Sequence, residues 1–204
     1  MSAATIAILV GLGFGVMLVR RRSLALWLLA AQSLLLGIAA LTLAEPGSGM
    51  VVAGAILIVR AVAMPALLAL IRRRTPEPAP VTPATTVVVR LLVAAVVSLV
   101  AVASVPPLGL GDPAAEHGSL ALLSLGVAIV VMRKPALVQL LGILVAENGV
   151  YLLAVSVQGG IPFAIELGVV FDLALVITVA AAFAAKIHAE VGSGDTDLLK
   201  ALRD

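Results

Sequence analysis

Residues 133–157 read RKPALVQLLGILVAENGVYLLAVSV, a basic pair and a proline followed by a long apolar stretch. A helix that crosses the hydrocarbon core of a bilayer needs about 20 apolar residues, which is the length of this stretch. Glu147 and Asn148 stand near its middle. The segment therefore predicts a transmembrane helix that carries an ionisable side chain close to the centre of the bilayer.

The rest of the chain repeats this pattern. Six further apolar runs occupy residues 2–19, 23–44, 50–71, 85–104, 118–132 and 162–185. Of the 204 residues, 62% are hydrophobic and 12% are charged, against about 45–50% and about 25% in an ordinary soluble domain. The composition excludes a soluble enzyme, a nucleic-acid-binding module and a disordered chain. It predicts an all-α, polytopic integral membrane protein with about seven transmembrane helices.

Basic residues predict how these helices are oriented. With seven spans, eleven of the 13 lysines and arginines fall on one side of the membrane and none falls on the other. Cytoplasmic loops carry an excess of lysine and arginine. We therefore expect the N-terminus outside, the C-terminus in the cytoplasm, and a multi-pass location in the inner (cytoplasmic) membrane of the cell.

The order of spans and loops predicts four segments. Residues 1–71 form an N-terminal three-helix unit, residues 72–117 a connector with the fourth span, residues 118–185 a C-terminal three-helix unit, and residues 186–204 a cytoplasmic tail. Both three-helix units read as span, basic cluster, span, turn and span. This shared order predicts a parallel duplication.

Five charged residues fall inside the predicted spans: Arg60, Arg90, Glu147, Glu166 and Asp172. A charge at the bilayer centre costs at least about 2.5–3.5 kcal/mol, so each of them needs a partner, water or a function. Glu147, Arg60 and Asp172 lie nearest the midplane. Arg90 and Glu166 lie closer to the ends of their spans, from where a side chain can extend to the interface.

Two interpretations of the midplane charges stay open. A carboxylate whose charge state responds to a neighbouring charge takes up and releases protons, as a proton path requires. A static ion pair of Arg60 with Glu147 or Asp172 would instead only fix the packing of the helices. Helical geometry places Tyr151 on the same stripe as Glu147 and directs Asn148 toward a different neighbour.

No cofactor, metal or catalytic site is predicted. Cysteine is absent, and His117 and His188 stand alone in the sequence. His188 follows the seventh span and titrates near neutral pH, so it is a candidate proton donor, with an ordinary interfacial histidine as the alternative. Gly11 and Gly15 in the first run are the small residues that let membrane helices approach closely.

The C-terminal third carries a set of motifs with characteristic spacing. They are E-N-G at 147–149, G-G-x-P at 159–162, E-L-G at 166–168, F-D at 171–172 and D-T-D at 195–197. With these motifs, residues 140–188 resemble component E of hydrogenase-4 and of related formate hydrogenlyase complexes. The same third also resembles the small K subunit of respiratory complex I, with its acids displaced by about one helical turn: Leu144 stands where that subunit has its first glutamate.

The resemblance implies a complex I-like membrane arm, in which electron transfer in a peripheral redox module drives the movement of protons or sodium ions. The partners would be antiporter-like membrane subunits and that redox module, and this chain would bind no redox cofactor. Within this interpretation, the proton path consists of Glu147, Asp172, Glu166 and Tyr151, and the charge modulators are Arg60, Arg90 and His188. Two alternatives stay open: a purely structural subunit that cements antiporter-like subunits, and a stand-alone carrier of small solutes.

Overall fold

A computed structural model describes residues 1–19, 21–44, 49–74, 86–109, 112–133 and 136–157. All of them belong to the first of two compact units, residues 1–166. The predicted seventh span, with Glu166 and Asp172, and the tail after it, with His188, lie outside the described residues. Regular structure in the described ranges is entirely α-helical.

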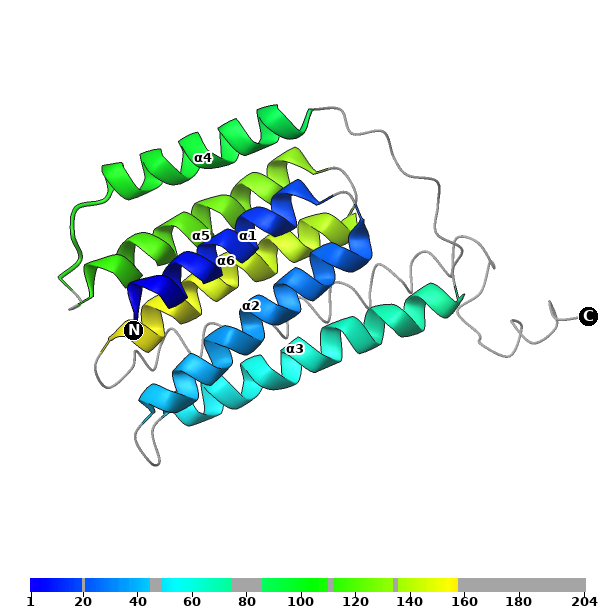
Figure 1. Ribbon diagram of the computed structural model, residues 1–204, viewed down its shortest axis with the longest axis horizontal. Helices are drawn as coiled ribbons and strands as arrows, with labels where there is room; N and C mark the ends of the chain where they lie inside the picture. Colours follow the sequence, from blue (N-terminus) through cyan, green and yellow to red (C-terminus); the bar gives the residue numbers. More distant parts are fainter. Residues whose placement is uncertain (20, 45–48, 75–85, 110–111, 134–135, 158–204) are drawn as a thin grey trace, which may run out of the picture. The chain divides into compact units, whose positions relative to one another are not determined.

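The described ranges contain six helices, which follow one another in chain order (Figure 1). Their bounds are α1 Ala3–Leu18, α2 Arg22–Leu43, α3 Gly49–Arg74, α4 Val87–Ser104, α5 Pro113–Met132 and α6 Ala136–Ser156. They confirm the positions of the first six predicted runs. Pro65 lies inside α3, which continues past it to Arg74.

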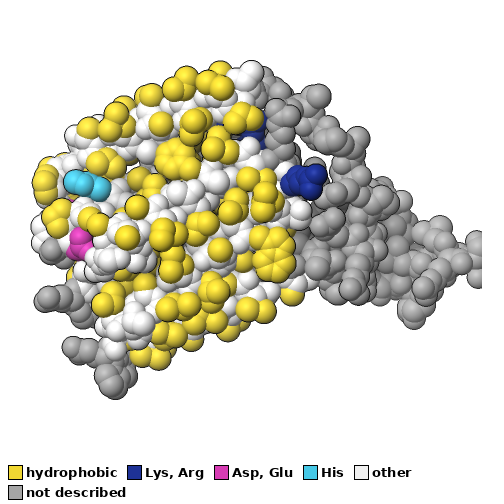
Figure 2. Space-filling view, in the orientation of Figure 1, with side chains coloured by type: hydrophobic (Ala, Val, Ile, Leu, Met, Phe, Trp, Pro, Cys, Tyr) yellow, Lys and Arg dark blue, Asp and Glu magenta, His cyan; other side chains and the backbone are white. Residues whose placement is uncertain are grey.

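Four of these helices are long and apolar enough to cross a membrane: α2 over Ser23–Leu43, α4, α5, and α6 over Val138–Ser156. Helix α1 and the apolar segment Gly49–Ala63 of α3 are shorter. Apolar side chains cover the visible face of the described helices, with basic side chains at one end and histidine and acidic side chains at the other (Figure 2). These features are those of a multi-pass membrane protein.

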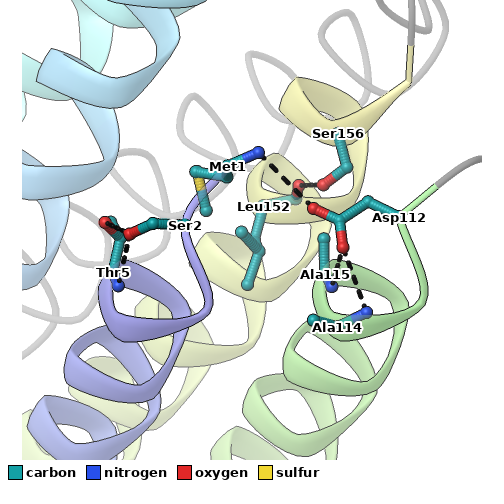
Figure 3. Close-up of polar contacts among 8 residues, drawn as sticks. All are labelled: Met1, Ser2, Thr5, Asp112, Ala114, Ala115, Leu152 and Ser156. Carbon is teal, nitrogen blue, oxygen red and sulfur yellow. Dashed lines mark hydrogen bonds and ion pairs between the residues drawn. The ribbon is translucent and has the colours of Figure 1, made fainter.

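Helix α5 begins at Pro113, earlier than the predicted start at residue 118. Oδ1 of Asp112 accepts hydrogen bonds from the backbone N–H groups of Ala114 (3.1 Å) and Ala115 (3.3 Å), as Figure 3 shows. An aspartate at the N-cap followed by proline at the first helical position is a strong helix start. The predicted boundary at residue 118 therefore falls inside a helix, and Glu116 belongs to its first turn.

The cap of α5 gives a first test. Asp112→Ala should lower the free energy of unfolding by about 1 kcal/mol, because two backbone N–H groups lose their acceptor. Thermal unfolding of the full chain in detergent, followed by circular dichroism, measures the change. Asp112 also lies 3.5 Å from the amino group of Met1 (Figure 3). Asp112→Asn keeps the cap and removes the charge, so an equal loss in both variants would contradict the capping role.

Helices α1 and α5 run parallel and in contact. The Met1 amino group approaches Asp112 at one end, and Nη2 of Arg133 donates to the carbonyl oxygen of Val19 (3.1 Å) at the other. Helix α4 packs on α1 and α5 through a narrow buried stripe of Arg90, Ala94 and Ser98. Most of its remaining surface is apolar and exposed, as expected for a helix in contact with lipid.

Two helix pairs pack at backbone contact. A Cβ atom added to Gly126 of α5 would lie 2.5 Å from the carbonyl oxygen of Gly142 and 2.5 Å from the backbone nitrogen of Ala146, both in α6. Between α2 and α3, a Cβ atom on Gly37 would lie 3.0 Å from the carbonyl oxygen of Gly54. Close packing at small residues is a main source of helix association in membranes, where lipid removes the hydrophobic driving force between helices.

The glycines of α1 only partly follow the prediction. Gly15 does face another helix, since an added Cβ would lie 3.0 Å from Cδ1 of Leu28. The prediction for Gly11 is wrong among the described residues, because an added Cβ there would meet nothing within 4 Å. The tight position is Gly13, where the added atom would lie 2.9 Å from Cδ2 of Leu122 and 3.3 Å from Nε2 of Gln32. Sequence alone does not show which side of an apolar helix faces its neighbours.

Candidate functional site

The central feature of the described unit is a buried ion pair between α3 and α6. Nη1 of Arg60 donates to Oε2 of Glu147 at 2.7 Å. The two residues are 7% and 5% exposed, although 87 positions separate them in the sequence. The structure thus brings together two of the three charges predicted near the midplane, and the ion pair considered from the sequence is present between Arg60 and Glu147.

The other terminal nitrogen of the same guanidinium binds side chains of α2 and α6. Nη2 of Arg60 donates to Oδ1 of Asn148 and, at 3.4 Å, to Oγ of Ser33. Nδ2 of Asn148 also donates to Oγ of Ser33 at 3.2 Å. The side chains of Asn148 and Ser33 are buried. One guanidinium therefore holds a carboxylate and an amide from adjacent positions of α6, together with a hydroxyl from α2.

The network continues from Asn148 to α1. Nδ2 of Asn148 donates to Oε1 of Gln32 at 2.9 Å, and Nε2 of Gln32 donates to the carbonyl oxygen of Leu9 at 2.9 Å. Gln32 is buried in the middle of α2. Polar contacts thus connect α3, α6, α2 and α1 without leaving the protein interior.

Tyr151 lies one helical turn after Glu147 and faces the same cation. The centroid of its ring is 5.7 Å from Cζ of Arg60, within the range of a cation–π interaction. The expectation for Asn148 needs correction. The Asn148 amide does contact a different helix, α2, through Gln32. It also shares a partner with Glu147, because the two terminal nitrogens of the Arg60 guanidinium bind Glu147 and Asn148 separately.

The bonds around Arg60 offset part of the cost of burying the two charges. Removing an ion from water costs several kcal/mol even after the protein relaxes, and a partner compensates this only with good geometry and further hydrogen bonds. The planar fork of arginine provides such geometry, since its two terminal nitrogens donate in different directions. Here one nitrogen binds Glu147, and the other binds Asn148 and Ser33.

Arg90 lies in α4, in a different part of the bundle from the Arg60–Glu147 pair. It is in the first turn of α4, near the end of its span as predicted, but its side chain is 1% exposed and packs within the bundle. Burial and the nearby charge of Arg90 lower the pKa of Arg133, which caps the end of α5. The structure thus brings Arg60 to Glu147, and Arg90 to Arg133.

Gln32 and Glu116 are buried polar residues that were not predicted from the sequence. Gln32 lies in the middle of a mostly apolar run. Because polar side chains within membrane spans usually bind a neighbouring helix, this position could have indicated that Gln32 has a buried partner. Glu116 was assigned to a loop, but it is 3% exposed, and its Oε2 accepts from the backbone N–H of Leu108 at 2.9 Å. The helix start at Asp112-Pro113 is the signal that would have placed Glu116 in α5.

Among the described residues, the network joins the Glu147 carboxylate to the Arg60 guanidinium, with amide and hydroxyl groups around them. A carboxylate in such a setting is a group that can hold or release a proton. Within the described ranges, no group of three or more histidine, cysteine, aspartate or glutamate side chains could hold a metal ion. No protein family, curated protein or solved structure matches the chain.

Proposed function

We propose that this chain is a membrane subunit of a complex I-like respiratory hydrogenase or a related redox-driven ion pump, and that Glu147 carries the translocated proton through its part of the membrane arm. The proposal includes seven spans, an external N-terminus and a cytoplasmic C-terminus in the inner membrane. The observation that carries it is the buried contact of Glu147 with Arg60, at 2.7 Å. The resemblance of residues 140–188 to component E of hydrogenase-4 supplies the kind of complex.

The charge of Glu147 depends on the position of Arg60. A carboxylate in a low-dielectric interior stays ionised while an arginine is beside it, and becomes protonated when that charge moves away or is compensated. Arg60 reaches Glu147 from α3 through a long side chain, so a change of rotamer alters the distance between the charges. Repeated opening and closing of this pair would load and unload one proton in each cycle.

Other residues extend this path in the proposal. Tyr151, beside the Arg60 guanidinium, would provide a hydroxyl next to the carrier. Asp172 and Glu166 would continue the path, and His188 would connect it with the cytoplasm, all three outside the described residues. Electrons would remain in the peripheral redox module, while antiporter-like subunits would exchange protons or sodium ions with this chain.

One observation favours a second candidate, a structural subunit. Arg60 donates to Glu147, Asn148 and Ser33 together, which is how a static ion pair would fix the packing of three helices. In that role the same residues would cement the membrane arm, and the charge of Glu147 would not change during turnover. The two candidates differ in what a neutral isostere at position 147 should do.

The test is Glu147→Gln in the native complex. Glutamine keeps the size of the side chain and an oxygen acceptor for Arg60, but cannot carry a proton. We expect the complex to assemble, shown by co-purification of its subunits, and coupled proton uptake into inverted membrane vesicles to be abolished. Glu116→Gln, a buried carboxylate outside the network, is the matched control and should pump normally.

An assembled Glu147→Gln complex that pumps at the normal ratio would overturn the proton role. Loss of assembly in this variant, with normal assembly of Glu116→Gln, would favour the structural subunit instead.

A further inference from the structure

In the series of hydrogen bonds from Arg60 to α1, each side chain donates to the next group along the series. Arg60 donates to Oδ1 of Asn148, the Asn148 amide donates to Oε1 of Gln32 at 2.9 Å, and the Gln32 amide donates to the carbonyl oxygen of Leu9 at 2.9 Å. All three side chains in this chain of bonds are buried. The backbone of α1 is therefore connected to the guanidinium by an uninterrupted series of bonds.

The two ends of the series fix the orientation of both amides. A guanidinium only donates, so Asn148 must turn its oxygen toward Arg60. A backbone carbonyl only accepts, so Gln32 must turn its nitrogen toward Leu9. Rotating either amide by half a turn would place two donors or two acceptors against each other. The series therefore has one satisfied arrangement.

The packing of α1 gives Gln32 its route to Leu9. Nε2 of Gln32 would lie 3.3 Å from a Cβ atom on Gly13, and Leu122 and Leu125 approach the same point at 2.9 and 3.0 Å. The Gln32 amide thus reaches the backbone of α1 beside Gly13, which has no side chain to block it. Gln32 is fully buried at this point.

Amide groups neither gain nor lose protons in the physiological range, so this branch cannot serve as a proton path. We infer that Gln32 and Asn148 are positioning residues, which link the guanidinium of Arg60 to α1 and thereby favour the closed form of its contact with Glu147 over the open form. The inference rests on the proposed function for its role in transport, since it takes Glu147 as the proton carrier. Arginine has a long, flexible side chain, and without this anchor it would spend part of its time away from the carboxylate.

The experiment measures the charge of Glu147 in the full chain, reconstituted in lipid nanodiscs at pH 7. Infrared spectra separate the band of a protonated carboxyl group from that of a carboxylate, and the bands of Glu147 are those lost when Glu147→Gln is added to each variant. Asn148→Leu should raise the ratio of protonated to ionised Glu147 about tenfold, because the guanidinium loses a neighbouring acceptor; this ratio corresponds to about 1.4 kcal/mol. Gln32→Met should change it in the same direction by a smaller factor, about threefold.

The chain offers a matched control for Gln32→Met. Nε2 of Gln139 in α6 donates to the carbonyl oxygen of Val130 in α5 at 3.2 Å, the same type of bond outside the network. Gln139→Met should leave the bands of Glu147 unchanged. If Asn148→Leu does not fold, the comparison of Gln32→Met with Gln139→Met decides the matter.

A folded Gln32→Met protein with the wild-type bands would overturn the inference, and so would an equal change in Gln139→Met. The pumping test of Glu147→Gln is independent of this result. Normal pumping by that variant would remove the transport role and leave the anchoring of Arg60 in place. Unchanged bands, together with abolished pumping, would remove the anchoring role and leave the carrier in place.

Discussion

Arg60→Met should lower the free energy of unfolding by about 3–5 kcal/mol, because it leaves the buried carboxylate of Glu147 without its cation. The pair is almost entirely buried, and Nη1 of Arg60 lies 2.7 Å from Oε2 of Glu147. Oδ1 of Asn148 would at the same time lose the hydrogen bond from Arg60 and keep the one from Oγ of Ser33 at 3.4 Å. Thermal or denaturant unfolding of the full chain in one detergent would measure the change.

The double variant Arg60→Met, Glu147→Met tests whether the loss of stability in Arg60→Met comes from the Glu147 carboxylate. Two apolar side chains of similar volume often replace a buried ion pair at little cost, so we expect most of the lost stability to return. Arg60→Lys should fall between wild type and Arg60→Met, because an ammonium group keeps the charge but cannot reach Glu147 and Asn148 together. A double variant as unstable as Arg60→Met would show that the loss does not come from the separation of the Glu147 carboxylate from the Arg60 guanidinium.

Gly126→Ala should have the second large effect, a loss of about 3 kcal/mol, in the upper part of the usual range for overpacking. The added Cβ would lie 2.5 Å from backbone atoms of Gly142 and Ala146, and no rotation of a side chain relieves contacts with backbone. Helices α5 and α6 would have to separate. The same unfolding measurement, made beside wild type, gives the magnitude.

Gly11→Ala is the matched control in the same chain. A Cβ at this position of α1 meets nothing within 4 Å, and alanine favours a helix by up to about 1 kcal/mol over glycine. We therefore expect Gly11→Ala to be neutral or stabilising. Equal effects of the two substitutions would contradict the close packing of α5 on α6. Because α6 also carries Glu147, Gly126→Ala should in addition disturb the contact with Arg60.

Much of the helical layout was predictable from the sequence. The first six apolar runs became α1 to α6, with ends that differ by few residues except at the start of α5. The physical reason is that lipid admits only long apolar segments with internally paired backbone groups, and composition alone reveals such segments. The start of α5 was missed because Glu116 and His117, near the beginning of the helix, interrupt the apolar pattern but not the helix.

The candidate site was only partly predictable. Counting residues along a span gives the depth of a charge, and in this way the sequence placed Arg60 and Glu147 at one level of the membrane. It did not decide whether Glu147 or Asp172 would face Arg60, and it did not include Gln32. Depth depends on distance along one helix, whereas partners depend on how each helix is turned and which helices are its neighbours.

What the sequence by itself determined is a helical membrane chain and the positions of its first six helices. Only the tertiary structure decided that Arg60 binds both Glu147 and Asn148, and that Gln32 links them to α1 beside Gly13. Helices that are apolar on all sides carry little periodic signal for the face that packs inward. Their rotation is set by the fit of small residues and by the pairing of a few polar groups, and both depend on all the neighbouring helices at once.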